Sequence, residues 1–320
     1  MATLNAISDK TSIAQDVEAL HLAFKGLGTD VNTVIRILGH RNSDQRQLII
    51  RAYKDLFQGD LIKRLESELS GEFEKAMYRW MLEPADRDAV LAHVAINQGR
   101  KHYHVLVEIV SVLSPEEVLN VRCAYHDRYK RSLEEDVAAH TTGDLRQFDI
   151  LKLGFDFEHL LVGLVSAFRY GGNEINAKLA KTDAEILHES MKEKNGNHEE
   201  AIRILTTRSK AQLLATSTAT EMIIAYPLPS DFHKALHTAI RCISDYHKYY
   251  EKVLLNAITR IGIEREDAIT RVVVSRAEKN MKDIMELYYK RNSVHLEDEI
   301  AKEFHGDYKK FILTLLGKEI

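Results

Sequence analysis

The chain has 320 residues, 45% of them hydrophobic, with only 15 glycines and 4 prolines, which predicts a large and mostly helical core. The net charge of −4 and the lack of a long lysine or arginine run exclude a general attraction to nucleic acid, so no nucleic-acid partner is expected. No apolar stretch is long enough to span a membrane, the start lacks signal-peptide features, and two cysteines cannot form a disulfide framework, so a reduced, cytoplasmic protein is predicted.

Residues 1–12 form a short segment ahead of the first helical pattern. In residues 13–84, apolar side chains recur every three to four positions in five stretches, which predicts five helices. These stretches begin near Ile13, Val31, Ser43, Leu61 and Phe73. Ser43 is the expected N-cap of the third helix. The turn between the first two helices is rich in glycine.

This five-helix pattern recurs along the chain. The residues 12, 20, 27 and 30 positions after Arg41 are of the same types as those at the same distances after Arg276. Weaker copies start at Leu113 and Arg208. The residues reached are Tyr53, Leu61, Glu68 and Gly71 in the first copy, Tyr125, Leu133, His140 and Gly143 in the second, and Tyr288, Leu296, Glu303 and Gly306 in the last. The sequence therefore predicts four repeats, at residues 13–84, 85–170, 171–245 and 246–320.

Two repeats depart from the common register. The second has about 12 extra residues, 148–159, so that its last helix is expected to resume only at Leu160. The third is shortened, because Arg208 to Phe232 spans 24 residues where Arg41 to Phe73 spans 32. Its atypical segment, residues 217–231, indicates that one helix is truncated or lost.

The glycine-rich turn, Gly26-Leu27-Gly28-Thr29, carries the clearest functional signal. Such a turn presents backbone carbonyl oxygens outward, and the carboxylate of Glu68, 42 residues after Gly26, can fold back over them. Carbonyl and carboxylate oxygens are the ligands that Ca²⁺ prefers in proteins. The pattern predicts a calcium site that is partly open and can accept an anionic oxygen such as that of a lipid phosphate.

Four five-helix repeats with Gly-x-Gly-Thr in the first turn and a carboxylate about 40 residues later closely resemble the annexin family. The short N-terminal segment and the sequence Gly39-His40-Arg41-Asn42 look most like plant annexins. The resemblance covers nearly the whole chain. It implies an all-α, slightly curved disc of four repeats that binds acidic phospholipid membranes peripherally when calcium rises. Oligomeric state and lipid preference stay open.

The resemblance also implies the ligands of the first repeat. The carbonyl oxygens of Phe24, Gly26 and Gly28 supply three, and Glu68 supplies two more in bidentate fashion. Calcium takes six to eight oxygens, which leaves positions for water or a phosphoryl oxygen. At the turn, Lys25 is expected to meet a lipid phosphate and Leu27 to insert among the headgroups. Many plant relatives have tryptophan at the position of Leu27, so this anchor is expected to be weaker here.

The other three repeats match the pattern less well. The fourth offers a tentative calcium site with one residue too many in its turn, and Arg260 brings a positive charge near the ion. Its ligands would be Ile258, Arg260, Gly262 and Glu303. Repeats two and three lack the glycine pair, and His140 stands at the carboxylate position of repeat two. No calcium is expected there.

Alternative functions rest on short motifs. His40 lies in a segment for which haem-peroxidase activity has been proposed among plant annexins, but a single histidine at a helix end specifies no haem pocket, and a capping or packing role is expected. Cys123 and Cys242 match positions proposed for a redox cluster, and both are also expected to be buried thiols.

The tripeptides Ile35-Arg36-Ile37 and Ile202-Arg203-Ile204 resemble a family motif linked to F-actin, although repeat symmetry alone accounts for them. No phosphate loop, zinc-binding His-Glu-x-x-His or Gly-x-Ser-x-Gly motif is present, so no enzyme is predicted. Calcium-dependent phospholipid binding is the predicted function. A calcium-independent helical or actin-associated scaffold and a haem peroxidase remain as alternatives.

Overall fold

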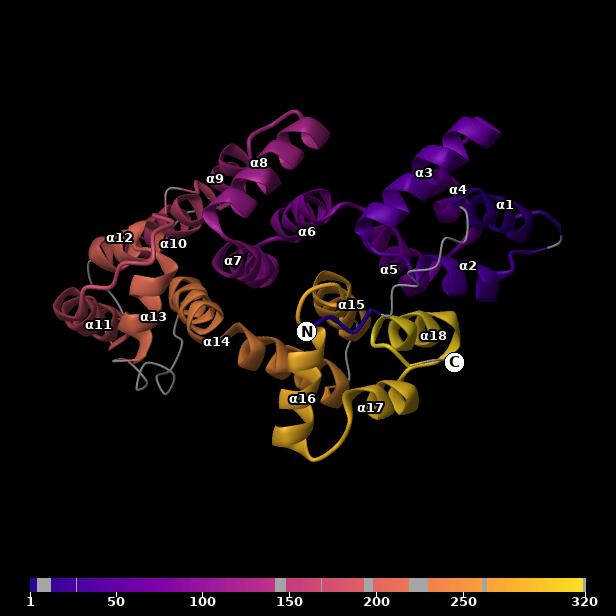
Figure 1. Ribbon diagram of the computed structural model, residues 1–320. Helices are drawn as coiled ribbons and strands as arrows, with labels where there is room; N and C mark the ends of the chain where they lie inside the picture. The colour runs from indigo at the N-terminus through magenta and orange to yellow at the C-terminus, as the bar shows by residue number, and fades with distance from the viewer. Residues whose placement is uncertain are drawn as a thin grey trace. The chain divides into compact units, whose positions relative to one another are not determined.

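The computed structural model describes residues 1–4, 13–26, 28–141, 148–167, 169–192, 198–218, 230–260 and 264–318 (Figure 1). Across these ranges every regular element is helical, which confirms the predicted all-α fold. Repeat one holds α1 (Ile13–Ala23), α2 (Val31–Leu38), α3 (Ser43–Phe57), α4 (Leu61–Glu68) and α5 (Gly71–Met81). Repeat two holds α6 (Pro84–Gln98), the 3₁₀ turn η1 (Arg100–His102), α7 (Tyr103–Val112), α8 (Pro115–Tyr129), α9 (Leu133–Thr141) and α10 (Phe148–Val165).

The second half of the chain continues the series. Repeat three holds α11 (Ala177–Lys192), α12 (Glu199–Thr207) and α13 (Lys210–Thr218). The long α14 (Asp231–Thr259) has a non-helical residue, Asp245, which divides it between repeats three and four. Repeat four continues with α15 (Arg265–Arg276), α16 (Met281–Asn292), α17 (Leu296–Glu303) and α18 (Gly306–Leu315).

The chain divides into two compact units. Unit 1 comprises Met1–Pro84 with His247–Ile320, and unit 2 comprises Ala85–Tyr246. Repeats one and four therefore share unit 1, and repeats two and three share unit 2. Each unit joins two repeats because the apolar faces of a single five-helix repeat need a partner to be covered. No described helix is long and apolar enough to cross a lipid bilayer.

In unit 1, α1 packs on α2 and α3, and α18 lies against α2, α5 and α15 (Figure 1). Trp80, at the centre, is fully buried and donates its indole N–H to the carbonyl oxygen of Leu38 at 2.8 Å. The guanidinium of Arg46 lies 3.6 Å from the centroid of this indole ring and pairs with Glu278 of repeat four at 2.9 Å. A cation covered by an aromatic face and paired with a carboxylate tolerates burial, so these contacts hold the two repeats together.

A buried ion pair fixes the ends of α1 and α2 relative to each other. Arg41, just after α2, donates from Nε and Nη2 to the two carboxylate oxygens of Asp16 on α1, at 2.7 and 2.9 Å. Both side chains are more than nine-tenths buried. Repeat three has the same pair at the same spacing, Arg208 with Asp183. Because the pair joins α1 to the end of α2, it also sets where the turn between these helices lies.

Several expectations for the helices need correction. The N-cap of α3 is Asn42, which forms a reciprocal capping box with Gln45, and not Ser43. Residues 148–159 do not precede the last helix of repeat two but form its first part, since α10 already begins at Phe148. α10 has 18 residues where α5, the last helix of repeat one, has 11, so it is about two turns longer. Phe157, Leu160 and Leu161 of α10 are buried in the core of unit 2.

The shortening of repeat three is visible in α13, which has 9 residues where α3 and α8 have 15. Most of the atypical segment, residues 219–229, lies outside the described residues, and so does the expected loss of a helix there.

Candidate calcium site

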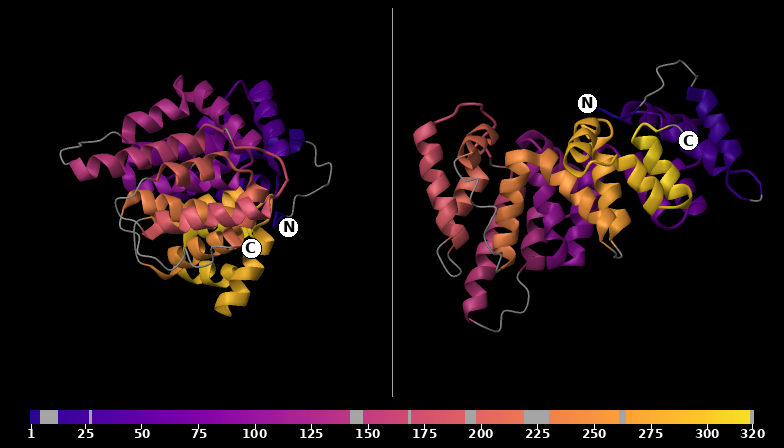
Figure 2. Two further views of the ribbon diagram at one scale, coloured as in Figure 1. Left: turned by 90° about the vertical axis from the view of Figure 1, so that its left-hand side faces the viewer. Right: turned by 90° about the horizontal axis from the view of Figure 1, so that it is seen from below.

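The turn between α1 and α2 adopts a backbone that only glycine takes up easily. Gly26 has φ of +121° and Gly28 has φ of +99°, and a side chain at either position would be strained. The N–H of Asp30 closes the turn by donating to the carbonyl oxygen of Ala23 at 2.9 Å. The described part of the turn projects from the ends of the helices (Figure 2).

Asp30 starts α2 as its N-cap, accepting hydrogen bonds from the backbone N–H and hydroxyl of Thr33 at 3.1 and 2.8 Å. These bonds favour the ionised carboxylate and hold the pKa of Asp30 below its usual value. On the other side of the turn, the Phe24 side chain is buried and meets Tyr53 edge to face. The turn is therefore tied down at both ends, by a cap and by an aromatic anchor.

Glu68, the last residue of α4, lies beside this turn. Nη2 of Arg64 is 2.9 Å from the carbonyl oxygen of Phe24 and 2.8 Å from Oε1 of Glu68. The hydroxyl of Thr29 donates to Oε2 of the same carboxylate. Nη2 of Arg64 therefore contacts both the Phe24 carbonyl oxygen and the Glu68 carboxylate, which are 44 positions apart in the sequence.

The carbonyl and carboxylate oxygens at this turn are suitable ligands for a hard cation such as Ca²⁺. None of the hydrogen bonds among the described residues uses the carbonyl oxygen of Gly26 or Gly28. The described residues also contain no cluster of three or more His, Cys, Asp or Glu side chains able to hold a metal. Backbone carbonyl oxygens with one carboxylate beside them, as at this turn, are ligands that Ca²⁺ accepts. Lys25 is exposed beside it, and Leu27 lies outside the described residues.

Repeat four places two of its tentative ligands in a similar way. Nη2 of Arg265 is 3.0 Å from the carbonyl oxygen of Ile258 and 3.3 Å from Oε2 of Glu303. Nε of Arg265 also donates to Ala257 at 2.8 Å. The cation that reaches these oxygens is therefore Arg265, while Arg260 is exposed. Gly262 lies outside the described residues.

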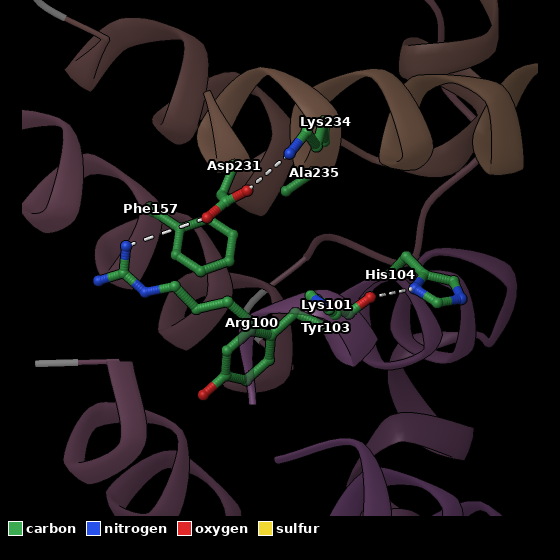
Figure 3. Close-up of a pocket in the computed structure, with 8 residues that line it drawn as sticks. All are labelled: Arg100, Lys101, Tyr103, His104, Phe157, Asp231, Lys234 and Ala235. Carbon is green, nitrogen blue, oxygen red and sulfur yellow. Dashed lines mark hydrogen bonds and ion pairs between the residues drawn. The ribbon is translucent and has the colours of Figure 1, made fainter. Parts of the chain in front are cut away.

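In repeat two the equivalent turn is cationic. Gly99 has a positive φ of 83°, and the turn continues into Arg100 and Lys101 of η1. These residues border a cavity of about 490 Å³ on unit 2 (Figure 3), where Arg100 faces Asp231 at 3.9 Å. The residues lining it are Arg100, Lys101, Tyr103, His104, Phe157, Asp231, Lys234 and Ala235.

At the carboxylate position of the same repeat, His140 points Nδ1 at the carbonyl oxygen of Asp136, 2.8 Å away. The turn of repeat two thus has cationic side chains beside it, and His140 replaces the carboxylate of repeat one, an arrangement that does not favour calcium. The turn of repeat three, residues 193–197, lies outside the described residues.

The remaining candidate residues have ordinary structural partners. His40 places Nδ1 at 2.9 Å from the carbonyl oxygen of Arg36, which is a helix-end contact. Ile35 and Ile37 are buried while Arg36 between them is exposed.

In the second copy of this tripeptide, Ile204 is buried and Arg203 pairs with Glu200. Of the cysteines, Cys242 on α14 is buried as expected, but Cys123 on α8 is exposed and its expected burial was wrong. Apolar neighbours in the sequence placed Cys123 near a core-facing stripe, and the packing of α8 turns it outward.

Arg64 and Arg265 were missed by the sequence reasoning. Arg64 stands four residues before Glu68, a spacing that predicts a pair along the helix. Its second contact, with the carbonyl oxygen of Phe24, joins residues 40 positions apart and depends on the tertiary structure of the repeat.

Four repeats of packed helices define an all-α repeat protein, and comparison with known proteins names the family. The annexin family model matches residues 15–80, 87–149, 182–241 and 249–315, one match in each predicted repeat. The chain belongs to the annexin family. It is 56% identical to annexin-like protein RJ4 of Fragaria ananassa over 95% of this chain and 96% of that protein. It is 44% identical to annexin D7 of Arabidopsis thaliana over 100% and 99%.

Solved structures agree with the family assignment. A crystal structure of chicken annexin V in complex with Zn²⁺ matches with a TM-score of 0.86 at 33% identity, covering 99% of both chains. A calcium-bound annexin (Sm)1 matches with a TM-score of 0.77 at 26% identity, covering 99% of this chain and 93% of that one. Annexins are in general non-enzymatic proteins that bind phospholipid membranes peripherally in a calcium-dependent way.

Proposed function

We propose that this protein is a cytoplasmic, calcium-dependent membrane-binding annexin whose principal site is the turn of repeat one. The observation that carries this proposal is the convergence of the Phe24 carbonyl oxygen and the Glu68 carboxylate on one atom, beside a turn held open by Gly26 and Gly28. The carbonyl oxygens of Phe24, Gly26 and Gly28, together with Glu68, would hold Ca²⁺.

Bound calcium supplies a divalent charge with coordination positions left for a phosphoryl oxygen. Nearby residues of the chain position the ligands and add charge beside the site. The Phe24 ring anchors the turn, the Thr29 hydroxyl orients the Glu68 carboxylate, and exposed Lys25 adds positive charge beside the site. Calcium affinity and membrane affinity are therefore coupled, and each ligand must raise the affinity for the other.

Sedimentation with vesicles tests the proposal. With vesicles that contain phosphatidylserine and phosphatidylcholine, the protein should pellet in calcium and return to the supernatant when a chelator is added. Vesicles of phosphatidylcholine alone are the control and should pellet little protein. Sedimentation that persists in chelator would support a calcium-independent scaffold instead. No sedimentation in millimolar calcium would contradict the proposal.

The two candidate sites should contribute unequally. Glu303→Gln is expected to raise the calcium concentration for half-maximal sedimentation by about threefold or less, because the turn of repeat four departs from the Gly-x-Gly-Thr pattern of repeat one. A calcium titration of vesicle binding measures this shift. If Glu303→Gln abolishes binding, repeat four and not repeat one is the principal site.

A further inference from the structure

A guanidinium group stands among the proposed calcium ligands. The same nitrogen of Arg64, Nη2, contacts both the Phe24 carbonyl oxygen at 2.9 Å and the Glu68 carboxylate at 2.8 Å. Calcium bound by these two oxygens would lie 2.3–2.6 Å from each. Such an ion and Nη2 would both be bound by lone pairs of the same two oxygens, and their positive charges would repel each other at this short range. The two cations are therefore competitors for these ligands.

Repeat four repeats the arrangement with an arginine from another position. Nη2 of Arg265 contacts the carbonyl oxygen of Ile258 and the carboxylate of Glu303, the counterparts of the two oxygens that Arg64 contacts. Arg265 comes from the start of α15, whereas Arg64 comes from α4. Two unrelated positions thus deliver a guanidinium to equivalent oxygens, which indicates that these oxygens form a cation-binding arrangement in both repeats.

Arg64 carries a positive charge at a position where two other repeats have an acidic residue. The residue at the same register is Asp136 in repeat two and Glu299 in repeat four. Each of these acids accepts a hydrogen bond from the tyrosine hydroxyl of its own repeat, Tyr125 and Tyr288. In repeat one the basic side chain turns toward the calcium ligands instead.

We infer that Arg64 is an affinity-determining residue that competes with calcium for the Phe24 carbonyl and Glu68. In the calcium-free protein its positive charge satisfies both oxygens and keeps the turn in its binding conformation. Calcium binding requires the guanidinium to leave. The Arg64 side chain is 44% exposed, so it can move into solvent without breaking the core. This inference rests on the proposed function. In it, Arg64 sets the calcium concentration at which the site responds.

Calorimetric titration with calcium chloride, without lipid, tests the inference directly. Arg64→Gln removes the competing charge and should tighten calcium binding about three- to tenfold, since both the ion pair and the repulsion of calcium are lost. Arg64→Glu, which restores the acid found in repeat four, should tighten it further. Lys63→Gln is the matched control, because it removes the same charge from an exposed neighbouring position on α4 and should leave calcium affinity unchanged.

A second readout separates competition from structural support. In chelator, Arg64→Gln should melt at the wild-type temperature or slightly below it, whereas saturating calcium should raise its melting temperature more than that of the wild type. Unchanged or weaker calcium binding by both Arg64→Gln and Arg64→Glu, in variants that melt cooperatively, overturns the inference while the wild type still binds. If the wild-type protein itself binds no calcium, the proposed function fails first.

Discussion

Glu68→Gln is expected to weaken calcium binding at repeat one on the order of 100-fold and to remove most calcium-dependent vesicle sedimentation. Glu68 is the only carboxylate among the proposed ligands, so its loss takes away their only full negative charge. Even changes in residues that merely support metal ligands cost 10- to 100-fold in affinity. Calorimetry in calcium chloride measures the affinity, and sedimentation with phosphatidylserine vesicles measures the consequence.

Glu66→Gln provides the matched control for this prediction. Glu66 lies on the same helix, is exposed, and loses the same charge. In Glu68→Gln the side-chain amide oxygen can still accept a hydrogen bond from the Thr29 hydroxyl. The free energy of unfolding in chelator should therefore change by about 1 kcal/mol or less. Wild-type calcium binding by Glu68→Gln would mean that the turn does not use this carboxylate.

Arg41→Met should lower the free energy of unfolding by about 3–5 kcal/mol, because it leaves the Asp16 carboxylate buried without its partner. The pair is enclosed, with both side chains more than nine-tenths buried, so solvent cannot replace the lost contact. Denaturation in urea, followed by circular dichroism, measures the effect. Since the pair joins α1 to the end of α2, calcium affinity is expected to fall as well.

Two further variants separate charge burial from lost packing. Arg36→Met removes an exposed arginine from the last turn of α2 and should cost about 1 kcal/mol or less. Replacing the whole pair, in Asp16→Leu with Arg41→Met, should give a protein more stable than Arg41→Met alone, because no unpaired charge is left. A double variant as unstable as the sum of both single ones would show that packing, and not the ion pair, dominates.

The sequence by itself determined the helices, the four repeats and the pairing of a glycine turn with Glu68. These features depend on local periodicity and on a register repeated along the chain, and both can be counted in a sequence. The need for glycine at positions 26 and 28 is equally local, because it follows from backbone φ angles. That is why the candidate site could be named before its geometry was known.

Only the tertiary structure decided which cation meets the candidate ligands. The spacing of Arg64 and Glu68 predicts a pair along α4, but contact with the Phe24 carbonyl requires the Arg64 side chain to reach the residue that follows α1. The same holds for the exposure of Cys123 and for residues 148–159, which form the first part of α10. Contacts between distant segments depend on how helices pack, and the sequence pattern of one helix does not contain that information.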